Sequence, residues 1–188
     1  MHRRTTLPAD SRLADRQPPR IMVCDFHQDD PRKCTSQKLQ RLHLARPIHR
    51  LSRIPPRAIV LNPGSDQVLS FQDRTLIMQH GLVGLDCSWN LIDTILQNRT
   101  RGEDRRLPIL LAGNPTNYAS RGRLSTAEAL AAALFITGFE REAERILGVF
   151  SWGATFLSLN KQPLKDYSNT PPHQMLERER EYFPTIGA

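Results

Sequence analysis

The residue best suited to chemistry in this sequence is an aspartate at the end of an apolar segment. Asp86 closes the segment Leu82–Asp86, and Trp89 follows three residues later. A carboxylate in apolar surroundings needs a dedicated partner or changes its proton affinity, and either property serves proton transfer. Alternatively, Asp86 caps the helix that follows, and Trp89 is an ordinary core residue. The residues alone leave both interpretations open.

Two other segments are expected to lie near the same place as Asp86. In open α/β sheets, ligands bind beyond the carboxyl ends of the strands. The loop 33–35 follows the first expected strand, the turn 86–89 follows the third, and the long turn 113–126 follows the fourth. The sequence therefore predicts a ligand site formed by these three segments.

An alternation of strands and helices must position these segments. Apolar segments bounded by turn residues predict strands at 21–26, 58–61, 82–86 and 107–112. Helical spacing and capping residues predict helices at 35–44, 70–81, 91–96, 125–137, 140–150, 154–160 and 164–167. The most specific signal is the capping box Ser125-Thr-Ala-Glu128 before an alanine-rich run. Residues 46–56 and 99–106 are expected to be irregular, and the alternation predicts an α/β fold with a parallel sheet.

Several common catalytic signatures are missing from the sequence. No G-x-G-x-x-G motif follows an expected strand, and there is no phosphate-binding G-x-x-x-x-G-K-[ST] loop and no G-x-S-x-G elbow. His27, Asp29, Asp30 and Cys34 lie close together in sequence, but their spacing fits no standard zinc site. We therefore expect no bound metal.

The basic charge of the chain is concentrated in its first third. Residues 1–60 hold 13 lysines and arginines against 5 acids, whereas residues 61–188 hold 13 against 14, and the net charge is +7. A one-sided basic excess favours a polyanionic partner such as nucleic acid, but it also fits a solubilising arm. No run reaches about 18 apolar residues, so no membrane span is expected. An odd number of cysteines (Cys24, Cys34 and Cys87), with no C-x-x-C pair, predicts a reducing compartment.

Six strings in order, between about residues 21 and 167, carry a resemblance to a known family. They are DPRKCTSQKL (30–39), VLNP (60–63), LDCSW (85–89), RLP with AGNPTNY (106–118), LSTAEA (124–129) and FSWG (150–153). Together they resemble the small-subunit ribosomal RNA aminocarboxypropyltransferases of archaea and eukaryotes.

The resemblance implies a reaction, a fold and a partner. The family uses S-adenosylmethionine as donor and transfers its 3-amino-3-carboxypropyl group, not its methyl group. The acceptor is N3 of a hypermodified uridine in small-subunit rRNA, so the implied partner is that rRNA or the pre-ribosomal small subunit. The implied fold is α/β, with a small N-terminal part followed by a SPOUT-like C-terminal domain with a deep trefoil knot. The implied location is the cytoplasm, and also the nucleus if the source is a eukaryote.

The resemblance also suggests boundaries along the chain. We expect a basic flexible arm at 1–20, an N-terminal α/β domain that contacts RNA at 21–80, a SPOUT-like cofactor-binding domain at 81–167 and a tail at 168–188. Residues 168–188 read either as a tail or as a loose charged helix.

Site roles carry over from the family position by position. Asp86 resembles the aspartate proposed as the base, and Trp89 resembles the tryptophan that packs on the methylsulfonium region. The remaining positions at which the family binds the donor are Thr35, Leu85, Leu107, Gly122 and Thr126.

This sequence departs from the family pattern at a few positions. Ser36 and Ala119 stand where glycines are expected, Gly113 where alanine is usual, and Gly122 where a bulkier residue is common.

The family gives the basic first third a role, since exposed arginines there would contact rRNA phosphates. The candidates are Arg41, Arg46, Arg50, Arg53 and Arg57. The main alternative functions are a SPOUT-type RNA methyltransferase, which moves the methyl group, and a non-catalytic small-subunit assembly factor.

Overall fold

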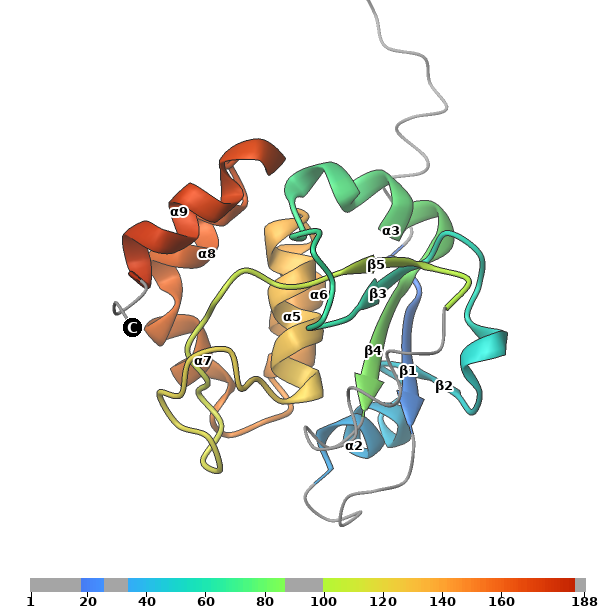
Figure 1. The fold of residues 1–188 in the computed structure, drawn as a ribbon. Coiled ribbons are helices and arrows are strands. Elements are labelled where there is room, and N and C mark those ends of the chain that lie inside the picture. Colours follow the sequence, from blue (N-terminus) through green and yellow to red (C-terminus); the bar gives the residue numbers. More distant parts are fainter. Residues whose placement is uncertain (1–17, 26–33, 87–99, 185–188) are drawn as a thin grey trace, which may run out of the picture.

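A five-stranded parallel sheet forms one side of the molecule, at the right in Figure 1. The computed structural model describes residues 18–25, 34–86 and 100–184. Across the sheet the strand order is β2-β1-β4-β3-β5. The strands are β1 (Ile21–Asp25), β2 (Arg46–Ile48), β3 (Ile59–Leu61), β4 (Leu82–Asp86) and β5 (Glu103–Arg105).

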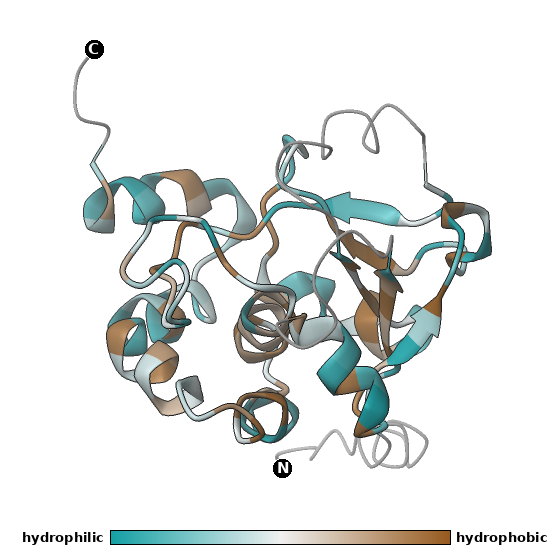
Figure 2. Ribbon diagram, turned by 90° about the horizontal axis from the view of Figure 1, so that it is seen from below, coloured by the Kyte–Doolittle hydropathy of each residue, from teal (hydrophilic) through white to brown (hydrophobic). Residues whose placement is uncertain are grey.

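Alternating side chains give the sheet two buried faces. Successive residues of a strand point to opposite faces. Val23, Leu61 and Leu82 join the larger core cluster with the helices, whereas Met22 and Val83 join a smaller cluster with residues 48–58. The apolar central strands contrast with the polar edge strand β5 in Figure 2.

The central strand β4 joins early and late parts of the chain. Its residues 82–86 pair with residues 21–25 of β1 along the whole length of both strands. On its other side β4 pairs with β3 over residues 59–61. Residues from the two ranges expected as separate domains, 21–80 and 81–167, thus share one sheet, and the division itself stays a prediction.

Short helices surround the sheet. They are α2 (Thr35–Arg41), η1 (Leu51–Arg53), η2 (Phe71–Asp73), α3 (Arg74–His80), α5 (Thr126–Ile136), α6 (Glu140–Leu147), α7 (Gly153–Leu159), α8 (Lys161–Tyr167), η3 (Pro172–Gln174) and α9 (Met175–Tyr182). Gly81 ends α3 with a φ of 100°, a left-handed value that favours glycine. The expected C-terminal stop at Gly81 is confirmed.

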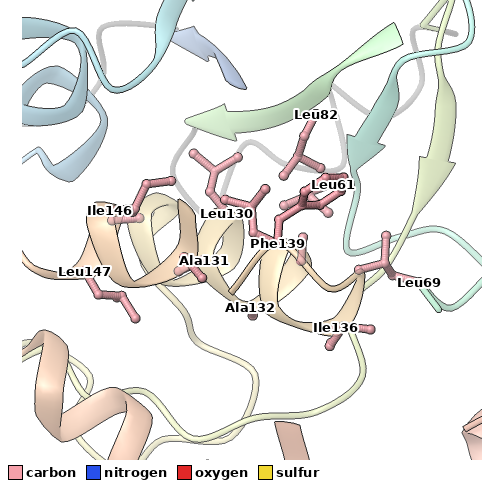
Figure 3. Close-up of a cluster of buried hydrophobic side chains, with 14 of the residues drawn as sticks. Leu61, Leu69, Leu82, Leu130, Ala131, Ala132, Ile136, Phe139, Ile146 and Leu147 are labelled. Atoms are coloured by element: carbon pink, nitrogen blue, oxygen red, sulfur yellow. The ribbon is translucent and has the colours of Figure 1, made fainter. Parts of the chain in front are cut away.

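Helix α5 packs directly against β4 and has almost no exposed side. Eight of its eleven residues are buried, in keeping with its alanine-rich, apolar composition. Figure 3 shows Leu130 of α5 directed toward Leu61 and Leu82 of the sheet, with Phe139 beside them. The neighbouring helix α6 is amphipathic and buries Ala143, Ile146 and Leu147. These helices fix the carboxyl end of β4 relative to the start of α5.

The parallel α/β architecture and the strands at 21–25, 59–61 and 82–86 confirm the sequence predictions. The strand predicted at 107–112 is wrong, since this segment makes only an isolated bridge between Leu111 and Arg121. Instead, β5 forms from the charged residues 103–105 and β2 from 46–48, both at the edges of the sheet. Charged and proline residues are tolerated at edges because one side of an edge strand faces away from the ladder.

The C-terminal segment is folded over much of its length. Residues 172–182 form η3 and α9, in which Met175 and Glu179 are buried. Figure 1 shows α9 lying beside α8, at the opposite side of the molecule from β1 and β2. Among the described residues, no helix has the length and apolar character that crossing a membrane requires. The helix predicted at 91–96 lies outside the described residues.

Candidate donor-binding and catalytic site

A pocket of about 280 Å³ opens at the carboxyl ends of β3 and β4. This is the edge of a parallel sheet where ligands bind. Five stretches of chain line it: the ends of the two strands, the wall 106–109, the turn at 122–124 and the first turn of α5. The lining residues are Leu61, Asn62, Pro63, Gly84, Leu85, Arg106, Leu107, Pro108, Ile109, Gly122, Leu124, Thr126 and Ala129.

The pocket wall is mainly apolar, with a few polar groups. Asn62, Arg106 and Thr126 supply the polar side chains of the lining. Gly84 allows α5 to approach β4 closely, because a Cβ atom at this position would lie 3.1 Å from Cγ2 of Thr126. An apolar cavity with a few placed polar groups is the usual form of a small-molecule site.

Asp86 lies beside this pocket and is held by three side chains. Its Oδ1 accepts a hydrogen bond of 2.7 Å from Oγ1 of Thr126, which lines the pocket. Its Oδ2 accepts hydrogen bonds from Oγ of Ser36 at 2.5 Å and from Sγ of Cys34 at 3.0 Å. Residues from β4, α5 and the start of α2 are thereby tied together at one carboxylate.

Cys34 acts here as a donor. Burial raises the pKa of the Cys34 thiol to about 11, and the nearby Asp86 carboxylate contributes in the same direction. The thiol therefore keeps its proton at neutral pH and can donate it to Asp86. Its Sγ also lies 2.9 Å from Oγ of Ser36, which closes a triangle of polar atoms.

Helix α2 is itself anchored to the C-terminal half of the chain. Nζ of Lys38 donates a hydrogen bond of 2.6 Å to the carbonyl of Val149 and lies 4.8 Å from the ring centre of Phe150. Phe150 in turn stacks on Trp152 with ring centres 4.7 Å apart. This contact helps to fix the beginning of α2, and with it Ser36, against the site.

The turn 113–125 is organised around one buried carboxylate. Glu128 is fully buried, and its Oε1 accepts hydrogen bonds from the backbone N–H groups of Gly113 at 2.7 Å and Asn114 at 2.9 Å. Its Oε2 accepts three more, each 2.7 Å long, from the Asn114 amide and from the backbone N–H and hydroxyl of Ser125. The capping box at Ser125 and Glu128 is confirmed, and the same carboxylate shapes the turn that brings Gly122 to the pocket.

The structure brings together most of the residues expected at the site. Leu85, Leu107, Gly122 and Thr126 all line the pocket. Thr35 is not among the lining residues, and its Oγ1 instead accepts a hydrogen bond of 3.3 Å from the Ala127 N–H. The segments expected to meet do so, through the contacts of Asp86 with Cys34 and Thr126, although the segment 113–126 does not follow a strand as predicted.

One expected site residue, Trp89, lies outside the described residues. The donor-binding roles assigned from the family stay predictions for every residue.

Sequence reasoning missed the roles of three residues of the site, although Cys34 lies within the predicted site loop 33–35. Ser36 and Cys34 contact Asp86 across about 50 positions of sequence, and Glu128 was identified only as half of a capping box. One signal could have indicated the contacts of Cys34 and Ser36, namely their position in and just after the loop that follows the first strand. Strands β1 and β4 end at the same level, with Asp25 opposite Asp86, so residues that follow β1 lie near Asp86.

The five arginines proposed to contact RNA are all solvent-exposed. They lie at the end of α2, on β2, beside and within η1, and in the turn before β3. Among the residues described by the structure, no three His, Cys, Asp or Glu side chains gather as a metal site.

Comparisons with known proteins agree with one another. The family model "Ribosome biogenesis protein, C-terminal" matches residues 59–183. A second model, "Possible Fer4-like domain in RNase L inhibitor", matches residues 19–53, which contain two cysteines where an iron–sulfur cluster uses four thiolates.

Similar proteins come from archaea. A 16S rRNA aminocarboxypropyltransferase from Sulfurisphaera tokodaii is 41% identical over 89% of this chain and 97% of its own. A protein with the same description from Methanosarcina mazei is 43% identical over 75% of this chain and 81% of its own. The solved structure of the SAM-dependent rRNA:acp-transferase Tsr3 from Vulcanisaeta distributa superposes with a TM-score of 0.83 and 36% identity, covering 89% of this chain and 90% of that one.

Proposed function

Because the chain belongs to the family of 16S rRNA aminocarboxypropyltransferases, we propose that it is a transferase that moves the 3-amino-3-carboxypropyl group of S-adenosylmethionine to small-subunit rRNA. The observation that carries the proposal is the placement of Asp86 beside an apolar pocket. Leu85, Leu107, Gly122 and Thr126 line that pocket, and Asp86 is bonded to Thr126.

The choice of transferred group depends on which carbon the pocket presents. A sulfonium activates all three carbons bonded to sulfur, and the nucleophile attacks the one held in line with it at roughly 3–3.5 Å. We propose that Trp89 and the apolar pocket residues cover the methyl group, so that the γ-carbon of the aminocarboxypropyl group faces the acceptor. The apolar lining supports this proposal, because a methyl group gains from burial among apolar side chains.

Asp86 is proposed as the base that takes the acceptor proton. N3 of a uracil-type base carries a proton, and its nitrogen becomes nucleophilic as that proton leaves. An ionised carboxylate has about four acceptor positions, two on each oxygen. Donors from the described residues fill two positions on Oδ2 and one on Oδ1, which leaves a position on Oδ1, among these residues, for an N3–H donor.

The resulting step balances in atoms and electrons. The N3–H proton passes to Asp86, and the nitrogen electron pair forms a bond to the γ-carbon. The carbon–sulfur bond breaks, and its electron pair returns to sulfur as a neutral thioether. The products are the modified base and 5′-methylthioadenosine, whereas transfer of the methyl group would leave S-adenosylhomocysteine.

The exposed arginines are proposed as the surface that holds the rRNA. Arginine binds phosphate oxygens through a planar fork of donors. Arg41, Arg46, Arg50, Arg53 and Arg57 are exposed and belong to the basic first third of the chain. Contacts of this kind position an RNA without selecting its sequence.

The finer features of the fold are inferred from the resemblance to the family. We infer that the C-terminal part is SPOUT-like and that the chain forms a deep trefoil knot around the donor pocket. The strand order is non-sequential, with β4 between β1 and β3. Non-sequential orders also occur in unknotted α/β sheets, so the proposal of a knot rests on the resemblance to the family. A crystal structure in which no part of residues 62–126 passes through a loop formed by the rest of the chain would contradict the knot.

Product analysis tests the proposed reaction. Wild-type protein is incubated with S-adenosylmethionine and small ribosomal subunits that lack the modification, and the small-molecule products are separated by chromatography. We expect 5′-methylthioadenosine in step with modification of the rRNA. Release of S-adenosylhomocysteine would identify a methyltransferase, and the absence of turnover would favour a non-catalytic assembly factor.

A matched pair of variants tests the role of Asp86. Asp86→Asn keeps the size of the side chain but removes the base, and the turnover rate should fall by about 10²- to 10⁴-fold. The control Asp66→Asn changes an exposed aspartate in the loop after β3 and should leave the rate unchanged. Full activity in Asp86→Asn would remove Asp86 from the proposed mechanism.

A further inference from the structure

Side chains from the C-terminal helices hold the backbone of the pocket wall. Asn160, at the end of α7, accepts a hydrogen bond of 2.8 Å from the Leu111 N–H and donates one of 2.8 Å to the Leu111 carbonyl. The Tyr167 hydroxyl donates to the Ile109 carbonyl at 3.2 Å, and Glu179 of α9 accepts from the Ile109 N–H at 3.0 Å. The pocket wall 106–109 and the backbone that continues from it to Leu111 are therefore held by residues 49 to 70 positions later in the chain.

Glu179 also forms an ion pair with an arginine of the pocket. Nη1 of Arg106 lies 2.8 Å from Oε2 of Glu179, and Nη2 lies 3.3 Å from Oε1, a two-point contact. The side chains are only 22% and 12% exposed, respectively, and Arg106 lines the pocket. Within the described ranges, no second carboxylate contacts the Arg106 guanidinium.

This pair matters for a cationic donor. S-adenosylmethionine carries a positive charge on sulfur, and a positive charge in the wall of a mainly apolar pocket would repel it. A carboxylate that contacts the guanidinium at two points cancels most of that repulsion. The amount of cancellation depends on Glu179 keeping its charge and on α9 staying in place.

We propose that Glu179 is a positioning residue of the donor pocket, which fixes the wall at Ile109 and neutralises Arg106 so that a sulfonium can bind. This inference rests on the proposed function, because it takes S-adenosylmethionine as the donor. The C-terminal helix α9 thereby becomes part of the donor site, although Glu179 is not one of the lining residues.

Two ligands that differ in charge separate the electrostatic role from a structural one. S-adenosylmethionine and S-adenosylhomocysteine share the adenosine and amino-acid parts, and they differ by one methyl group and the positive charge on sulfur. Damage to the wall would weaken both ligands equally. A change in pocket charge would instead alter the ratio of their dissociation constants.

The variant Glu179→Gln removes the charge and keeps a side-chain oxygen that can accept from Ile109. We expect S-adenosylmethionine to bind on the order of tenfold more weakly relative to S-adenosylhomocysteine, the size of effect that one unit charge near the pocket has at an effective dielectric constant of about 20. The control Glu177→Gln changes an exposed glutamate of the same helix and should leave the ratio as in the wild type. Titration calorimetry on the full chain measures both dissociation constants for the wild type and for each variant.

The opposite charge change gives an independent check. Arg106→Gln leaves Glu179 negative beside the pocket, so the ratio of the two dissociation constants should move in favour of S-adenosylmethionine. This variant tests the charge effect even where the Glu179→Gln protein does not fold. An unchanged ratio in the folded variants would overturn the inference. Wild-type protein that binds neither ligand would instead refute the proposed donor, so the two failures are distinguishable.

Discussion

Replacement of Glu128 by glutamine should destabilise the protein strongly, because five donors converge on this one buried carboxylate. Glutamine has nearly the same shape, but it replaces one acceptor oxygen by an NH₂ group. If the NH₂ group takes the position of Oε1, the N–H groups of Gly113 and Asn114 lose their acceptor. If it takes the position of Oε2, the N–H of Ser125 and the side chain of Asn114 lose theirs.

The magnitude follows from this count. Either orientation leaves at least two buried donors without a partner, and each such donor costs about 1–3 kcal/mol. The free energy of unfolding should therefore fall by about 2–6 kcal/mol, a large part of the stability of a typical domain. Donor binding should weaken as well, since the turn that Glu128 holds carries Gly122 and Leu124 to the pocket.

Urea denaturation followed by circular dichroism measures the effect through the midpoint and slope of the transition. The matched control is Glu144→Gln, which changes an exposed glutamate in the middle of α6 and should stay within about 0.5 kcal/mol of the wild type. A Glu128→Gln protein as stable as that control would show that the buried network contributes no stability, and the reasoning would fail.

Two further predictions concern reactivity and RNA binding. The high pKa of the Cys34 thiol, about 11, means that its thiolate forms only in strong base, so iodoacetamide should label Cys34 slowly at pH 8 and much faster toward pH 11. Peptide mapping by mass spectrometry follows this one cysteine, and rapid labelling at pH 7 would contradict a protonated donor to Asp86. For the RNA surface, Arg50→Ala and Arg53→Ala should each lower the slope of log K against log salt by about 0.7–0.9 in filter-binding titrations with rRNA. Lys161→Ala, which changes an exposed residue at the start of α8, serves as the control, and equal slopes in all three variants would argue against this surface.

Local signals in the sequence were enough to predict the helix and the two strands next to the site. The capping box at Ser125 predicted the start of α5, and the apolar segments at 21–25 and 82–86 predicted the two strands that carry Asp25 and Asp86. These signals act over a few residues, so they can be read from the chain without knowing the fold. The closeness of the segments that follow β1 and β4 could be predicted from the general geometry of parallel sheets, whereas the turn 113–126 reaches the site without a strand before it.

Long-range contacts could not be predicted in the same way. Residues 107–112 are apolar and look like a strand, but their backbone groups bond to Asn160, Tyr167 and Glu179, which follow much later in the sequence. The short edge strands β2 and β5 carry proline and charged residues that weaken any strand signal. The sequence showed only that Ser36 stands where the family pattern has glycine. Its contact with Asp86 became visible in the structure.

The position of β4 in the middle of the sheet affects how the chain can fold as it leaves the ribosome. Strands β1, β2 and β3 are synthesised before β4. In the finished sheet β4 lies between β1 and β3 and pairs with both of them. At about 5–20 residues per second, roughly 60 residues separate the emergence of β1 from that of β4, a delay of about 3–12 s. Through that interval β1 can pair only with β2, and the edges of β1 and β3 that β4 will cover expose backbone N–H and C=O groups that are open to pairing with another chain.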